Sequence, residues 1–135
     1  MDSKAGIRAA ISPTSGDIAV GWDGHLHLLN VNLEPVVQAN IGKRISSLAF
    51  SNQEEGIAVN CVAVGLHSGV VRLYSGFNLQ LVREVAGLPS APVISLAYSW
   101  DSRNLVVATN DGQVTILEKS GSKGTFRTPK YLTLQ

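Results

Sequence analysis

His25 and His27 are the side chains whose spacing comes nearest to a chemical site. On an extended strand, residues two apart point to the same face, so the two imidazoles could share a metal ion with Asp23 close by. A zinc site takes about three or four protein ligands, however, and His67 lies too far along the chain to be assumed a neighbour. The same spacing describes the outward face of a strand, so we expect no metal site.

Motifs for covalent and nucleotide chemistry are missing from the sequence. No serine lies in a Gly-x-Ser-x-Gly elbow, and none of the 13 glycines belongs to a phosphate-cradling Gly-x4-Gly-Lys-Ser/Thr loop. The single cysteine, Cys61, lies in an apolar run and is expected to be a packed strand thiol, which fits a reducing compartment. We therefore predict no enzyme activity, no catalytic residue and no cofactor.

Composition limits the classes of partner. The chain has 135 residues and a net charge of only +1, so it lacks the basic footprint of a nucleic-acid-binding protein. No apolar run approaches the roughly 20 residues that cross a bilayer, and we expect a cytoplasmic location. Basic residues after Glu118 would permit at most peripheral contact with an anionic membrane, although a solvated linker and an outer strand explain them more simply. They are Lys119, Lys123, Arg127 and Lys130.

The elements that carry these residues follow a repeat. The stretch from Asp111 to Glu118 has near-copies at residues 23–30 and 68–75, and the three copies contain Gly24, Gly69 and Gly112. Gly69 lies 45 residues after Gly24, and Gly112 lies 43 residues after Gly69 (69−24 and 112−69). Four-stranded propeller blades repeat with a period of about 40 to 45 residues, so the sequence predicts three such blades.

Alternating residues after each glycine predict a strand with one buried face. The second and fourth residues are aliphatic and are expected to point inward: Leu26, Leu28, Val71, Leu73, Val114 and Ile116. The residues between them are expected to point outward: His25, His27, Arg72, Gln113 and Thr115. A small residue, Gly21, Gly65 or Ala108, ends the preceding strand, and we expect it to help the two strands close in a tight turn.

The predicted fold is all-β, with antiparallel four-stranded blades at about residues 7–41, 45–86 and 93–135, and no long helix between residues 7 and 118. Propellers have about four to eight blades, so we expect these three to be part of a larger β-propeller. Two blade faces would otherwise stay open, and we expect the remaining blades or self-association to cover them.

The repeats resemble those of the WD-repeat family, whose units carry Asp-Gly, alternating aliphatic residues and then Trp-Asp. The Trp-Asp position here holds Leu29-Asn30, Tyr74-Ser75 and Leu117-Glu118, so these repeats are degenerate, and packing of aliphatic faces must replace the usual buried polar network. A narrower resemblance, to the C-terminal repeats of BEACH-domain proteins, is carried by residues 55–60, 65–75, 81–84 and 92–99.

This resemblance implies a non-catalytic, protein-interacting segment of a cytoplasmic scaffold that regulates lysosome, endosome and vesicle traffic, peripheral on those membranes at most. A free-standing small WD-type adaptor subunit of another cytosolic complex is the alternative.

Candidate binding residues lie in the turns. One face of a propeller carries the turns within each unit and the connections between units, and partners usually dock there. The residues expected on this face are Trp22, Asp23, Lys43, Arg44, His67, Asn110 and Asp111. Trp22 is either an interface anchor or folded back over its own blade, and Lys43 and Arg44 either meet an acidic partner or are solvated. Trp100, in a turn on the opposite side, has the same two interpretations as Trp22.

Overall fold

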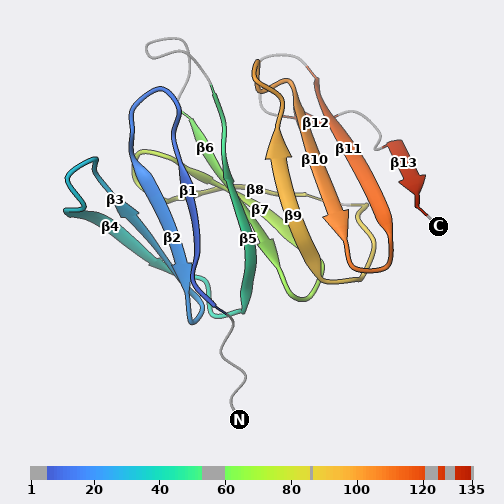
Figure 1. Ribbon diagram of the computed structural model, residues 1–135, viewed down its shortest axis with the longest axis horizontal. Helices are drawn as coiled ribbons and strands as arrows, with labels where there is room; N and C mark the ends of the chain where they lie inside the picture. The colour runs from blue at the N-terminus through green and yellow to red at the C-terminus, as the bar shows by residue number, and fades with distance from the viewer. Residues whose placement is uncertain (1–5, 53–59, 86, 121–124, 127–129, 135) are drawn as a thin grey trace.

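Three antiparallel β-sheets lie side by side in the computed structural model (Figure 1). The structure describes residues 6–52, 60–85, 87–120, 125–126 and 130–134. These residues contain strands and turns but no helix, and therefore no helical segment that could cross a membrane. The predicted all-β fold is confirmed.

Each sheet is a meander, and we call the sheets blades 1, 2 and 3 in chain order. Blade 1 consists of β1 (Arg8–Ile11), β2 (Ile18–Trp22), β3 (His25–Leu29) and β4 (Pro35–Asn40). Blade 2 consists of β5 (Ile45–Phe50), β6 (Cys61–Leu66), β7 (Val71–Ser75) and β8 (Leu81–Val85). Blade 3 consists of β9 (Val93–Tyr98), β10 (Asn104–Thr109), β11 (Gln113–Ser120), β12 (Thr125–Phe126) and β13 (Lys130–Thr133).

The outer edge of blade 3 is shared between two short strands. β13 pairs with the first half of β11, from Gln113 to Ile116, and β12 pairs with its end at Lys119 and Ser120. The outer strand that we expected after Glu118 is therefore present as β13. Of the basic tail residues, Lys123 and Arg127 lie outside the described residues, as do residues 55–59 of the BEACH-like stretch.

Turn chemistry separates the strands of blade 1. The Ser12 hydroxyl accepts a hydrogen bond from the Ser15 amide at 3.2 Å, and Gly16, with φ +77°, allows the chain to reverse before β2. Between β3 and β4 the Asn30 side-chain oxygen accepts from the amides of Asn32 (2.9 Å) and Glu34 (3.0 Å). Such side-chain bonds to the local backbone favour turns over continued strands.

The blades pack through their faces, with the first strand of each blade against the first strand of the next. β5 contacts both β1 and β9. Between blades 1 and 2, Leu26 and Leu28 of β3 belong to one buried cluster with Val62, Val64 and Leu66 of β6. Burying such side chains contributes about 1.5–3 kcal/mol each, so aliphatic packing holds the blades together.

The second inter-blade cluster repeats this arrangement one blade along. Val71 and Leu73 of β7 belong to one cluster with Leu105, Val107 and Leu117 of blade 3, and all five are at most 4% exposed. The residues at the second and fourth positions after the repeat glycine therefore face the following blade.

Small residues let neighbouring blades approach closely. A Cβ atom on Gly21 would lie 2.9 Å from the Ile45 side chain, and one on Gly65 would lie 2.5 Å from both Val93 Cγ1 and Ser47 Oγ. Ile45 and Val93 begin the first strands of blades 2 and 3. The small residue thus serves the contact with the next blade, a reason that differs from the tight turn we expected.

The predicted burial pattern of the third unit is wrong. Ile116, expected inward, is 37% exposed and Val114 is only half-buried, whereas Thr115, expected outward, is fully buried together with Leu117. A blade in the middle of a propeller buries both faces, one against each neighbour. Val114 and Ile116 occupy the face that looks away from blade 2, which no described residue covers.

The assignment of one outward face also fails in blade 2. Tyr74, on the same side of β7 as Arg72, is 6% exposed and packs in the cluster with blade 1. The Arg72 side chain itself is only 20% exposed and pairs with Glu84 of β8 at 3.0 Å. In blade 1 the corresponding residues, His27 and Leu29, are half-buried on the open side.

Candidate functional site

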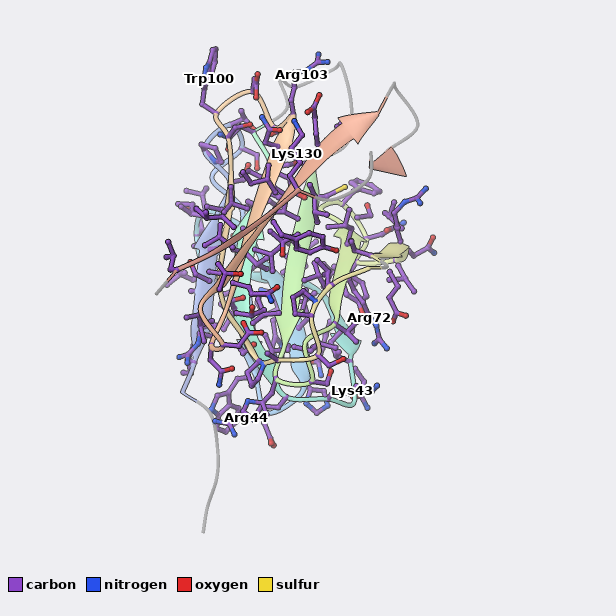
Figure 2. The ribbon with its side chains drawn as sticks, turned by 90° about the vertical axis from the view of Figure 1, so that its right-hand side faces the viewer. Lys43, Arg44, Arg72, Trp100, Arg103 and Lys130 are labelled. Carbon is purple, nitrogen blue, oxygen red and sulfur yellow. The ribbon has the colours of Figure 1, made fainter. Side chains whose placement is uncertain are left out.

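The candidate residues gather at one end of the molecule, which we call the turn end. It carries the β2–β3, β6–β7 and β10–β11 turns and the connections that enter β5 and β9, at the bottom of Figure 1. Figure 2 shows Lys43 and Arg44 at this end, and Trp100 and Arg103 at the opposite end.

Backbone hydrogen bonds fix the turns to the entering strands. The His67 amide donates to the carbonyl oxygen of Arg44 at 3.0 Å, and the Asn110 amide donates in the same way to Pro92 at 3.0 Å. His67 and Asn110 both stand two residues before their repeat glycine. The turn end is therefore built on the same pattern in blades 2 and 3.

Gly24, Gly69 and Gly112 shape these turns. All three have positive φ, at +75°, +97° and +85°, which favours glycine. Each also lies against the backbone that leaves the outer strand of its blade: Gly24 against Lys43, Gly69 against Pro89 and Ala91, and Gly112 against Leu134. Positive φ and close contact with the backbone therefore both favour glycine at these three positions.

A hollow of about 210 Å³ opens at the turn end where the three blades meet. Its lining comes from all three blades: Arg8, Arg44, Ser46, His67, Pro92, Val93, Ile94 and Asn110. Three of the seven predicted surface residues, Arg44, His67 and Asn110, are therefore brought together although they are far apart in the sequence.

Arg8 is the lining residue that the sequence analysis did not single out. Its Nε donates to the carbonyl oxygen of Ser46 at 2.9 Å, which links blade 1 to blade 2. The sequence did contain a feature that could have identified it. Arg8 pairs with Gly21 in blade 1, and the residues at the equivalent position of blades 2 and 3 are serines: Ser47, which pairs with Gly65, and Ser95, which pairs with Ala108. Blade 1 therefore has an arginine at a position where the other two blades have a small serine, and this departure from the repeat could have drawn attention to Arg8.

The other predicted surface residues lie on the same end without lining the hollow. Trp22 is 43% exposed and lies beside His25 on the open side of blade 1. This partial exposure fits neither a fully exposed interface anchor nor an indole that is folded back completely over its own blade. Asp23 has φ +52°, and its carbonyl lies 3.0 Å from His25 Nδ1. Lys43 contributes backbone to the contact with Gly24 and is exposed.

Asp111 is engaged within its own turn. Its carboxylate accepts hydrogen bonds from the Thr109 hydroxyl at 2.6 Å and from the Gln113 amide at 3.2 Å. The Thr109 hydroxyl is the main cause that holds the pKa of Asp111 below its usual range. At the opposite end, a hydrogen bond from the Ser99 hydroxyl is the main reason that the pKa of Asp101 is lowered.

The candidate metal ligands do not gather into a metal site among the described residues. The ring centroids of His25 and His27 are 6.4 Å apart, and no cluster of three His, Cys, Asp or Glu side chains forms in this part of the chain. Cys61 lies partly buried in β6, and burial raises the pKa of its thiol, which disfavours the reactive thiolate.

Trp100 stands apart from this end. It is 84% exposed in the turn before β10, and Figure 2 shows it at the far end from Arg44. Of its two interpretations the structure excludes an indole folded back over its blade.

The chain is similar in sequence to lysosomal-trafficking regulators. The chain is 43% identical over 125 residues to the lysosomal-trafficking regulator of Homo sapiens, and 32% identical over 106 residues to the lysosomal-trafficking regulator of Drosophila melanogaster. These alignments cover 84% and 78% of this chain but only 3% of each relative. No protein-family model matches the chain.

Similar solved structures are propellers or propeller-like in fold. The Dos1 propeller superposes with a TM-score of 0.70 at 19% identity, over 94% of this chain and 34% of that one. BamB from Moraxella catarrhalis gives a TM-score of 0.69 at 14% identity, over 90% and 35%. The chain is therefore a run of propeller blades of the WD-like type, homologous to a short segment of the lysosomal-trafficking regulators, which are BEACH proteins.

Proposed function

We propose that the chain is a non-catalytic, protein-interacting segment of a BEACH-type scaffold that regulates lysosome, endosome and vesicle traffic. The observation that carries this proposal is the 43% identity to a lysosomal-trafficking regulator over most of a chain that folds as propeller blades. In this proposal the turn end binds partner proteins, and the scaffold works in the cytoplasm or on the surface of endosomal and lysosomal membranes.

The open faces of blades 1 and 3 support a role inside a larger assembly. By strand register, Ile18, Val20 and Leu29 of blade 1 correspond to Val62, Val64 and Tyr74 of blade 2. The blade 2 residues are at most 6% exposed, whereas the blade 1 residues are only half-buried. A face built from the residue types of an internal interface is suited to another blade, either of the same scaffold or of a second copy.

A chimaera tests this function. The chain would replace the matching segment of the human lysosomal-trafficking regulator in cells that lack that protein, and lysosome size would be measured by microscopy. We expect the chimaera to restore the size distribution of unmodified cells and a chimaera carrying Leu73→Asp, which disrupts the core between blades 2 and 3, not to restore it. A well-expressed, folded chimaera without any effect on lysosome size would contradict the proposal.

A further inference from the structure

Positive charge is concentrated around the hollow at the turn end. The guanidinium groups of Arg8 and Arg44 line it, and no aspartate or glutamate is among the lining residues. The whole chain has eleven basic and ten acidic residues, so this concentration does not follow from composition. A concave surface with one sign of charge attracts ligands of the opposite sign.

These cations are not neutralised within the described part of the chain. Neither Arg8 nor Arg44 forms an ion pair there, whereas Arg72 and Lys130 each pair with a glutamate. Asp111, next to the lining residue Asn110, directs its carboxylate to Thr109 and Gln113. The hollow therefore keeps guanidinium donors for a ligand.

The backbone around the donors is held in place before any ligand arrives. The bond from Arg8 Nε to the Ser46 carbonyl fixes this guanidinium across the joint between blades 1 and 2. The bonds from the His67 and Asn110 amides fix the two turns against the strands that enter β5 and β9. Such preorganisation lowers the entropic cost of binding.

Apolar side chains complete the lining. Val93 is fully buried, Ile94 is 59% exposed, and Pro92 lies beside them. A bare inorganic anion would leave this apolar surface unused, whereas a peptide could place carboxylates on the arginines and an apolar side chain against Ile94. Guanidinium groups bind carboxylates with two parallel hydrogen bonds.

We propose that this hollow binds an acidic segment of a partner protein, with Asp or Glu carboxylates on Arg8 and Arg44 and an adjacent apolar residue on Ile94. This inference rests on the proposed function, because it names the partner chemistry of the turn end. The hollow opens at that end, whereas the open blade faces lie on the flanks of the molecule (Figure 1), so both kinds of contact can form at once.

Peptide binding to the full chain tests the proposal. A dye-labelled peptide of alternating Glu and Leu residues would be titrated by fluorescence anisotropy and compared with a peptide that carries Gln in place of Glu. We expect Arg44→Glu to weaken binding of the Glu peptide about tenfold or more, because it removes charge-assisted hydrogen bonds. Arg103→Glu makes the same change of charge at the opposite end and should weaken binding less than about twofold.

Arg8→Gln is a second variant, in case Arg44→Glu alters the melting profile, and it should weaken binding of the Glu peptide in the same direction. Equal effects of Arg44→Glu and Arg103→Glu, or equal binding of the Gln peptide, would overturn the proposal. Displacement of the Glu peptide by millimolar inorganic phosphate but not by acetate would also overturn it, because the hollow would then be a phosphate site.

The acidic-segment proposal and the proposed trafficking function can fail independently of each other. Rescue of lysosome size by the chimaera, together with no effect of Arg44→Glu on peptide binding, would overturn the acidic-segment proposal alone. Loss of rescue with intact peptide binding would overturn the trafficking role alone.

Discussion

Single glycines at the turn end combine a positive φ with close contacts, and Gly69 shows this best. Its φ is +97°, and a Cβ there would lie 2.8 Å from the carbonyl oxygens of Pro89 and Ala91. The sequence predicted this glycine as part of the repeat, because its spacing from Gly24 and Gly112 is visible in the chain. It could not predict the contact with residues 89–91, because that contact depends on how the outer strand returns.

Gly69→Ala should lower the free energy of unfolding by about 1–3 kcal/mol, from an unfavourable φ and displaced backbone. Urea denaturation measures the loss. Gly42→Ala is the matched control: Gly42 also has positive φ, +72°, but the nearest atom to its Cβ would be Asn40 Oδ1 at 4.0 Å. Gly42→Ala should lower the free energy of unfolding by about 1 kcal/mol, because only the φ angle is unfavourable there. If Gly42→Ala lowers this free energy as much as Gly69→Ala or more, the contact at Gly69 is unimportant.

At the scale of elements, strand positions were predictable, and strand faces were predictable only in part. The residues expected inward in blades 1 and 2, Leu26, Leu28, Val71 and Leu73, are buried, whereas Val114 and Ile116 of blade 3 are not. Alternation after Gly24, Gly69 and Gly112 identifies β3, β7 and β11, since a period of two residues is local information. Which face is buried depends on neighbours, and in blade 2 both faces are. Ile116 repeats the position of Leu73 and was therefore expected to be buried, but its face looks toward a position that no described residue fills.

Leu73 and Ile116 give a matched test of these faces. Leu73→Asp places an unpaired charge between blades 2 and 3, where Leu73 is 4% exposed, and should cost about 4 kcal/mol or more, enough to unfold a small domain. Ile116→Asp puts the same charge on the open face, which is hydrated in the monomer, and should change the melting temperature of dilute, monomeric protein by only a few degrees. Circular dichroism melts measure both, and similar losses in the two variants would contradict the assignment of the open face.

Sites on this molecule depend on the arrangement of blades more than on local motifs. His67 and Asn110 could be predicted as turn residues of one face, because each stands two residues before a repeat glycine, and Arg44 could be predicted because it lies in a connection between units. Their meeting around one hollow with Arg8 could not be predicted, since it needs the rotation between blades, which the sequence does not encode in any local pattern. The same holds for Trp22, whose partial exposure is set by the open side of blade 1.

At the scale of the whole molecule, the described residues form a stack of three blades with a face at each flank that none of them covers. Val114 and Ile116 of blade 3 occupy the positions that Leu26 and Leu28 fill at the joint of blades 1 and 2, where both leucines are at most 2% exposed. Exposed faces of this kind favour association with a complementary face. We therefore expect both flanks of the molecule to be interfaces with further blades.

Size-exclusion chromatography with light scattering, at micromolar concentration, tests this claim most directly. We expect the chain to elute with a mass above that of the 14.3 kDa monomer, and we expect Ile116→Asp, which charges one open face, to shift it toward the monomer. A stable 14.3 kDa monomer with a sharp cooperative melt would contradict the claim, because three blades would then suffice without any cover and a small free-standing adaptor would explain the chain better.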